Sequence, residues 1–217
     1  MATQRSMGDI RHFIWDFDGT LLDTYPVIIQ NLREALRQYG HDCDPVEAMK
    51  LMLTNLPTAR NRYADRFGID REELFATYLS YNEKAAKELQ AEPMAGIREV
   101  LERICETGRY NYIFTNRKAS ETILYLEKYG LTKYFREVVG AEAPCFAYKP
   151  APDALLYLMD KYGMNPQDAV MVGDRDCDLG SARNANMGKV HYVCAVAPET
   201  LACDWRVESY EEMLALI

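Results

Sequence analysis

Segments with the pattern of strands alternate with segments that have the pattern of helices along most of this 217-residue chain. From Pro93 onward, short apolar runs typical of buried strands are separated by amphipathic segments with helical spacing. Such alternation is typical of a parallel sheet that carries helices on both faces. We therefore predict an α/β fold with a doubly wound, Rossmann-like parallel sheet. The predicted strands after Pro93 are 110–114, 137–140, 169–172 and, as the final one, 189–193; the predicted helices are 97–107, 120–129, 153–162, one that opens within 173–178 and ends at Gly188, and a short last helix capped by Ser209 and Glu212.

Residues 23–92 have a different pattern, without a credible strand. An amphipathic helix is predicted over 25–39, and two short helices broken at Leu56-Pro57 are predicted over 42–66. A longer helix follows from Arg71, with Asp70 and Glu73 at the spacing of a capping box. The chain is thus predicted to contain a core domain made of residues 9–22 and 93–217, interrupted by an all-helical domain at residues 23–92.

Two carboxylates follow the first predicted strand. The apolar run from His12 to Trp15 ends in Asp16-Phe17-Asp18-Gly19-Thr20, and open α/β sheets bind ligands at the carboxyl ends of their strands. Acids so close together require a cation, a shared proton or strong hydrogen bonds. Their hard oxygen atoms suit Mg²⁺, which favours one or two carboxylates together with a substrate phosphate. Taken alone, the same residues are more often only an acidic turn at the end of a strand, because Asp-Gly is a common turn dipeptide.

Polar groups also follow the later strands. Thr115 and Asn116 come after an apolar strand and before a helix, where they suit either an anion site or a helix cap. Lys149 precedes a proline in a loop with few charges, so its side chain is expected to project from an extended backbone. Asp174 and Asp178 lie four residues apart at the start of a helix and share a face, whereas Asp176 is interpreted as an ordinary acidic helix terminus.

Each of these sites is ambiguous alone, but together they match one chemistry. Phosphoryl transfer through an acyl phosphate needs a carboxylate that attacks phosphorus, cations that neutralise the phosphoryl oxygens, and a second acid that protonates the leaving oxygen. The sequence places two acids, a hydroxyl, a lysine and a further acidic pair at successive strand ends or adjoining loops.

In these motifs the chain resembles the haloacid dehalogenase superfamily, in the branch of phosphoglycolate-phosphatase-like and β-phosphoglucomutase-like enzymes. Four motifs occur in the family's order: DFDGT at residues 16–20, Thr115-Asn116, Lys149-Pro150, and GDxxxD at residues 173–178. The resemblance covers residues 10–215, and the helical insert stands where this branch carries its cap domain. The match is specific for the superfamily and says little about the substrate.

The resemblance implies a role for each matched residue. Asp16 would be the nucleophile that becomes an aspartyl phosphate, and Asp18 the general acid and base, its backbone carbonyl being a Mg²⁺ ligand. The metal ligands would be Asp16, Asp18, Asp174 and Asp178, the last acting directly or through water. Thr115, Asn116 and Lys149 would hold the phosphoryl group, with backbone N–H groups of residues 17, 18 and 116.

Composition excludes several other classes. The net charge is −8, and no basic patch occurs, which argues against nucleic acid or an anionic membrane as a partner. No apolar run reaches the length of a membrane-spanning helix, and residues 1–8 lack the apolar region of a signal peptide. The six cysteines contain no CxxC pair, which favours reduced thiols in a cytoplasmic protein. The oligomeric state stays open.

Three functions remain after this reasoning. The leading one is a Mg²⁺-dependent phosphatase that acts on a small phosphorylated metabolite, and the alternatives are a phosphomutase or a catalytically silent binding module. Intact Asp16, Asp18 and Lys149 argue against the silent module. Candidate substrate contacts in the insert are residues 54–58 and Arg60, with Arg62 and Tyr63 behind them. Arg60 could pair with a substrate carboxylate or second phosphate, and Arg117 is a comparable candidate outside the insert, although a solvated side chain is the commoner interpretation of either arginine.

Overall fold

The computed structural model describes residues 6–54, 56–140, 146–193 and 201–217 of the chain. Within these residues, six strands form one sheet in the order β5-β4-β1-β6-β7-β8, and every adjacent pair is parallel. The strands are β1 (His12–Trp15), β4 (Tyr110–Phe114), β5 (Phe135–Val139), β6 (Ala169–Gly173), β7 (Gly188–Tyr192) and β8 (Trp205–Val207). The doubly wound parallel fold predicted from the alternating pattern is confirmed.

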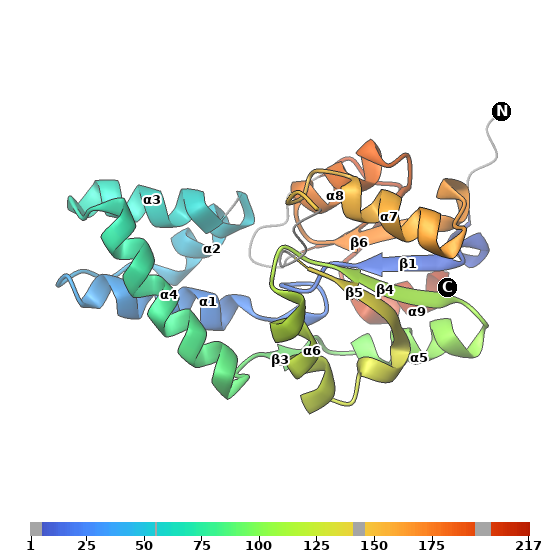
Figure 1. Ribbon diagram of the computed structural model, residues 1–217, viewed down its shortest axis with the longest axis horizontal. Helices are drawn as coiled ribbons and strands as arrows, with labels where there is room; N and C mark the ends of the chain where they lie inside the picture. Colours follow the sequence, from blue (N-terminus) through green and yellow to red (C-terminus); the bar gives the residue numbers. More distant parts are fainter. Residues whose placement is uncertain (1–5, 55, 141–145, 194–200) are drawn as a thin grey trace. The chain divides into compact units, whose positions relative to one another are not determined.

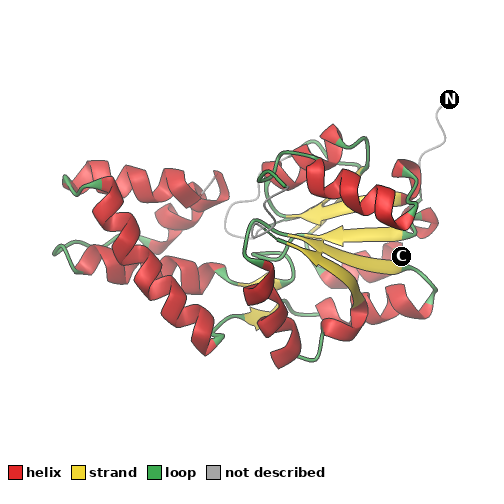
Figure 2. Ribbon diagram, viewed as in Figure 1, coloured by secondary structure: helices red, strands yellow, loops and turns green. Residues whose placement is uncertain are grey.

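Helices cover both faces of this sheet. Figure 1 shows α7 (Asp153–Tyr162) and α8 (Asp176–Asn184) on one face, and α5 (Ile97–Glu106), α6 (Ala119–Lys128) and α9 (Tyr210–Leu216) on the other. Figure 2 shows the same arrangement as a layer of strands between two layers of helices. The central strands are buried along their whole length, as continuous apolar runs require in a sheet covered on both sides. Short 3₁₀ helices lie at Met7–Asp9, Thr132–Tyr134 and Pro166–Asp168.

Residues 23–92 form a second compact unit, while the described residues before and after them form the first. The second unit contains α1 (Tyr25–Arg37), α2 (Pro45–Thr54), α3 (Leu56–Phe67) and α4 (Arg71–Glu88). Helix α1 buries Ile28, Leu32 and Leu36 on one stripe, which explains its contacts with α4. The chain passes between the units through two short paired strands, β2 (Leu22–Asp23) and β3 (Glu92–Pro93).

The structure corrects three details of the sequence analysis. The strand at residues 188–192 is not the final one, because β8 follows and pairs with it in parallel. Ser209 does accept a hydrogen bond from the Glu212 N–H, but the Glu212 carboxylate accepts from the N–H of Glu208 rather than from that of Ser209. The insert is also bounded by the short strands β2 and β3, which were not predicted.

The core of the first unit is built from both faces of the sheet. One large cluster packs Ile14, Tyr112 and Met171 from neighbouring strands against helix α7. This packing fixes β1 between β4 and β6, so the carboxyl ends of these three strands lie at the same edge. No helix in the described residues has both the length and the apolar character needed to cross a membrane.

Candidate active site

Asp16 directly follows β1 at the carboxyl edge of the sheet. Its backbone N–H donates to the carbonyl of Val172 in β6 at 2.8 Å, which continues the strand pairing to this residue. The chain then turns at Gly19, whose φ of 77° lies in the left-handed region that glycine adopts without strain. The Asp16 side chain is completely buried, so its charge must be compensated by neighbouring groups rather than by water.

Lys149 supplies that compensation. Its ammonium group donates to Asp16 Oδ1 and to the carbonyl of Phe114 at 3.0 Å, and it lies 2.6 Å from Asp178 Oδ1. The lysine side chain is as fully buried as the two carboxylates. Burial would lower the pKa of the ammonium, but the Asp16 and Asp178 carboxylates outweigh it and raise that pKa above its ordinary value. Lys149 is therefore a permanent buried cation between two acids.

Asp174 and Asp178 approach Asp16 from the end of β6. One oxygen from each of the three carboxylates lies within 4.8 Å of the others, and all three residues are buried. Asp178 packs so closely on Gly173 that a Cβ there would lie 2.4 Å from the Asp178 Cβ, so only glycine fits at this position. Asp178 is further fixed by the Arg175 N–H, which donates to its Oδ2 at 3.0 Å.

This cluster fits a divalent cation. Lys149 brings one positive charge to Asp16 and Asp178, and burial together with the charge of Asp178 raises the pKa of the Asp16 carboxyl to about 6. Asp16 Oδ2 is buried and has no hydrogen-bond partner among the described residues. An orphaned carboxylate oxygen beside two further acids is the kind of donor set that hard cations bind. The three buried aspartates could thus hold a divalent metal, which is the cofactor class predicted from the sequence.

Thr115 and Asn116 follow β4 at the same edge. The Thr115 side chain is buried, its hydroxyl oxygen accepts from the N–H of Arg117 at 3.0 Å, and its own N–H donates to Val139. The Asn116 side-chain carbonyl accepts from the N–H of Lys149 at 3.0 Å. This last bond ties the loop after β4 to the lysine loop, so the two motifs that are 33 residues apart in sequence meet in space.

Asp18 is held separately from the other acids. Its carboxylate pairs with Arg117, with Nη2–Oδ1 at 2.7 Å and Nε at 3.2 and 3.3 Å from the two oxygens. The Asp18 carboxylate does not belong to the three-aspartate cluster. Because the predicted metal contact of Asp18 uses its backbone carbonyl, a side-chain cluster does not test that role, and it stays a prediction.

Two arginines at this edge were missed or given little weight in the sequence analysis. Arg117 was interpreted as a solvated residue, yet only 11% of its side chain is exposed. Arg175 lies beside the acids with Nη2 4.0 Å from Asp16 Oδ2. Neither had a distinctive sequence signal, apart from standing next to a predicted motif residue.

The substrate contacts proposed for the helical insert are not tested by this geometry. Within that unit, the Arg60 guanidinium stacks on the Phe75 ring at 4.0 Å, and Tyr63 is buried with its hydroxyl donating to Glu47. Arg62 is exposed. Of the segment 54–58, residue 55 and the side chain of residue 56 lie outside what the structure describes.

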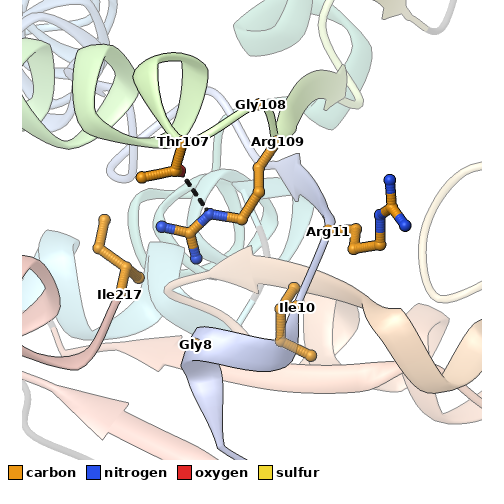
Figure 3. A pocket seen from close by; sticks show the side chains of 7 residues that line it. All are labelled: Gly8, Ile10, Arg11, Thr107, Gly108, Arg109 and Ile217. Carbon is orange, nitrogen blue, oxygen red and sulfur yellow. Dashed lines mark hydrogen bonds between the residues drawn. The ribbon is translucent and has the colours of Figure 1, made fainter.

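A cavity of about 400 Å³ lies elsewhere in the first unit. It is lined by Gly8, Ile10, Arg11, Thr107, Gly108, Arg109 and Ile217, as Figure 3 shows, and Arg109 Nε donates to Thr107 Oγ1 at 2.7 Å. Apart from Ile217, its lining residues precede β1 or β4, whereas Asp16 and Thr115 follow these two strands. In a parallel sheet the cavity is therefore at the opposite edge from the candidate site.

Comparisons with known proteins agree with this arrangement. The family model described as "Haloacid dehalogenase-like hydrolase" matches residues 13–192. A phosphoglycolate phosphatase of Vibrio parahaemolyticus is 27% identical over 190 residues, covering 82% of this chain and 81% of the relative. The pyrophosphatase PpaX of Listeria welshimeri is 26% identical over 216 residues, covering 97% of both chains.

Solved structures share the fold. The crystal structure of a HAD-superfamily hydrolase, subfamily IA, from Geobacter sulfurreducens aligns with a TM-score of 0.74 and 26% identity. It covers 100% of this chain and 99% of the other. The similarity therefore extends over both units of the chain and is not confined to the sheet.

Proposed function

This chain belongs to the haloacid dehalogenase-like hydrolase family, and from that premise we propose that it is a Mg²⁺-dependent phosphatase acting on a small phosphorylated metabolite. The relatives named as phosphoglycolate phosphatase and pyrophosphatase support phosphate chemistry, and differ in substrate. The proposed organisation is a catalytic core of residues 9–22 and 93–217, with residues 23–92 as a cap that excludes water and selects the leaving group.

The observation that carries the proposal is the asymmetric environment of the Asp16 carboxylate. Oδ1 receives the Lys149 ammonium, while Oδ2 is buried without a hydrogen-bond partner among the described residues. A nucleophilic carboxylate must be held in a fixed orientation while one of its oxygens makes no hydrogen bond. A buried acid with a purely structural role normally has hydrogen bonds to both oxygens. Asp16 is accordingly assigned as the nucleophile.

The reaction proceeds in two balanced steps. An Asp16 oxygen forms a bond to phosphorus while the bond from phosphorus to the leaving oxygen breaks, and Asp18 gives its proton to that oxygen. Water then attacks the phosphorus of the aspartyl phosphate, Asp18 takes a proton from it, and the bond to Asp16 breaks to release phosphate. The same carboxyl group thus acts first as acid and then as base.

Charge on the phosphoryl group is neutralised by the surrounding residues. Lys149 supplies a fixed cation, and Thr115 and Asn116 bring a hydroxyl, an amide and backbone N–H groups to the same edge. Asp16, Asp174 and Asp178, with the backbone carbonyl of Asp18, would hold Mg²⁺. When bound, the metal would supply further positive charge for the phosphoryl oxygens and offset the repulsion among the acids.

The test is an assay of purified protein with Mg²⁺ against sugar phosphates, phosphoglycolate, nucleotides and pyrophosphate. We expect release of phosphate that is lost in EDTA and in Asp16→Asn. The matched control is Asp176→Asn, which removes an exposed carboxylate from the same helix start and should leave turnover unchanged.

The outcomes separate the candidate functions. One substrate far ahead of the others identifies a specific phosphatase and distinguishes a phosphoglycolate from a pyrophosphate enzyme. Slight turnover that rises only with a bisphosphate activator indicates a phosphomutase. No turnover in folded protein that binds Mg²⁺ contradicts the proposal and favours a silent binding module, as does substantial activity in Asp16→Asn.

A further inference from the structure

We propose that Arg117 is a positioning residue for the acid–base step: its guanidinium holds the Asp18 carboxylate in the orientation from which the proton is delivered to the leaving oxygen. The inference rests on the proposed phosphatase function, and it gives Arg117 a role in orienting Asp18 that neither the family motifs nor the sequence analysis assigned. It also predicts for which substrates kcat/KM falls most when Arg117 is replaced.

The contact between Arg117 and Asp18 has the geometry of a fork. Nη2 lies 2.7 Å from Oδ1, and Nε lies 3.2 Å from Oδ1 and 3.3 Å from Oδ2. A planar guanidinium that reaches both oxygens restrains the side-chain torsions of the acid, which a single point charge cannot do. With 11% and 17% of the two side chains exposed, water competes little for the pair.

Arg117 is itself fixed on several sides. Its Nη1 lies 3.2 Å from Glu121 Oε2, one turn along in α6, and its guanidinium lies 5.8 Å from the centre of the Phe17 ring. Its backbone N–H donates to the Thr115 hydroxyl. Although burial would lower the pKa of the guanidinium, the charge of Asp18 outweighs this and raises it. The residue is thus a permanent, anchored cation.

The contact also joins two parts of the site. Asp18 belongs to the turn after β1, whereas Arg117 belongs to the loop after β4 that contributes Thr115 and Asn116. Asp16 and Asp178 are paired with Lys149 instead, and Asp174 accepts a hydrogen bond from the Thr20 hydroxyl. Arg117 thus partners the carboxylate that has to exchange a proton with substrate. Displacing a reacting group by about 1 Å can cost about a hundredfold in rate.

The experiment measures kcat/KM for a series of substituted phenyl phosphates, from p-nitrophenyl phosphate to unsubstituted phenyl phosphate. These substrates have nearly the same shape but leave with different ease, and kcat/KM reports the steps up to leaving-group release. In Arg117→Gln we expect kcat/KM to fall about tenfold more for phenyl phosphate than for the p-nitro compound, because only the poorer leaving group needs the proton. Arg117→Lys, which keeps the charge without the fork, should recover part of the selective loss.

A double-mutant cycle separates positioning from general damage. In an Asp18→Asn background, Arg117→Gln should have little further effect, because Arg117 acts through Asp18. Glu121→Gln, which loosens Arg117 without removing it, should lower kcat/KM less, but again more for phenyl phosphate than for the p-nitro compound. This variant replaces Arg117→Gln in the test if Arg117→Gln does not fold. The matched control Arg71→Gln removes an arginine that forks Asp65 at 2.8 and 2.7 Å on the exposed surface and should change nothing.

Equal losses on all leaving groups, full additivity with Asp18→Asn, or a rise in KM alone would overturn the inference, and the last result would make Arg117 a substrate-binding residue. Crystal structures of wild type and Arg117→Gln give a readout without turnover: we expect one Asp18 rotamer in wild type and a displaced or divided one in the variant. An unmoved Asp18 would equally contradict the proposal. Failure of the phosphatase function is distinct, since wild type itself would then hydrolyse none of the esters.

Discussion

The two units of the chain contain ion pairs of similar length in opposite environments. In the first unit, Lys149 lies 2.6 Å from Asp178 with both side chains fully buried. In the second, Arg66 lies 2.7 Å from Glu47 with 43% and 35% of the side chains exposed. Burying an ion pair costs several kcal/mol of desolvation, and an apolar replacement is often at least as stable. Distance alone therefore does not distinguish a functional pair from a surface pair, whereas burial does.

The pKa of a buried acid in the first unit and those of two exposed acids in the second are shifted in opposite directions. Burial and the charge of Asp178 raise the pKa of Asp16. In the second unit, hydrogen bonds from Arg66 and Arg71 lower the pKa values of Glu47 and Asp65. The Asp16 carboxylate of the first unit is thus unfavourable without a further cation, whereas the Glu47 and Asp65 carboxylates of the second unit are stabilised in their ionised form. The difference indicates where the molecule is organised for chemistry rather than for solubility.

The largest expected effect is that of removing the buried cation. Lys149→Met leaves Asp16 and Asp178 without their shared partner, so we expect the free energy of unfolding to fall by about 3–5 kcal/mol. Turnover should fall by a factor on the order of 10²–10³, because a charge that stabilises the phosphoryl oxygens is lost. Urea unfolding in EDTA and kcat measurements test both effects.

The control for this change is Lys161→Met. That lysine lies 2.9 Å from Glu137 Oε2, with 44% of its own side chain and 19% of the Glu137 side chain exposed, so water replaces the ammonium more easily than it does at the fully buried Lys149. We expect its unfolding midpoint and kcat to stay at the wild-type values. Equal destabilisation by the two substitutions would break the contrast between buried and exposed pairs.

The second effect is stabilisation by metal. If Asp16, Asp174 and Asp178 bind Mg²⁺ only in the folded state, a concentration 100 times the dissociation constant adds about 2.7 kcal/mol to the free energy of unfolding. Asp174→Asn should lose this gain, whereas Asp176→Asn, at an exposed acid two residues away, should keep it. Urea unfolding across a Mg²⁺ titration measures the difference, and an unchanged gain in Asp174→Asn would exclude this ligand set.

The third effect concerns pH in the metal-free protein. The Asp16 pKa is about 6 in the folded protein, against an ordinary value of 3.8. The folded state therefore holds this proton more tightly than the unfolded state does. The proton bound to Asp16 therefore contributes stability that is fully present below about pH 4 and is lost as the pH rises through about 6.

Asp16→Asn mimics the protonated acid and should not show this loss. At pH 7.5 in EDTA we expect the variant to be more stable than wild type by about 1–3 kcal/mol, with the difference vanishing below about pH 4. Parallel pH profiles for the two proteins would contradict the raised pKa. Asp176→Asn, measured alongside, should follow the wild-type profile.

The sheet and the position of the site could largely be predicted from the sequence, because strands and helices follow from local patterns of apolar residues. The run at residues 169–172 is apolar throughout, the run at 110–114 is apolar except for Asn111, and both end in polar turns, so their place as central strands follows from the sequence pattern. The acids and Lys149 could be assigned to one edge, because parallel strands end at the same side of a sheet. Strand β8 was missed since three residues are too few to show a period.

The partners of the site residues could not be predicted in the same way. The Asp18–Arg117 pair joins residues 99 apart in sequence, and a lone arginine is far more commonly solvated. Lys149 was expected to project from an extended loop, but its burial between two acids depends on the packing of several elements. Such contacts are set by the tertiary arrangement, which periodicity does not encode.

The smallest expected effect is in the second unit, where Arg71 forks Asp65 with 56% and 55% of the two side chains exposed. Arg71→Gln should leave the unfolding midpoint and kcat within experimental scatter, because exposed pairs exchange protein contacts for water at almost no cost. What remains of the interaction should disappear as salt is raised towards 1 M, where the screening length is about 3 Å. Lys149→Met, in contrast, should stay destabilised at every salt concentration, since its partners are shielded from ions. A loss of stability in Arg71→Gln that does not depend on salt would show that this exposed pair stabilises the second unit. The contrast between the buried pairs of the first unit and the exposed pairs of the second would then be smaller than we expect.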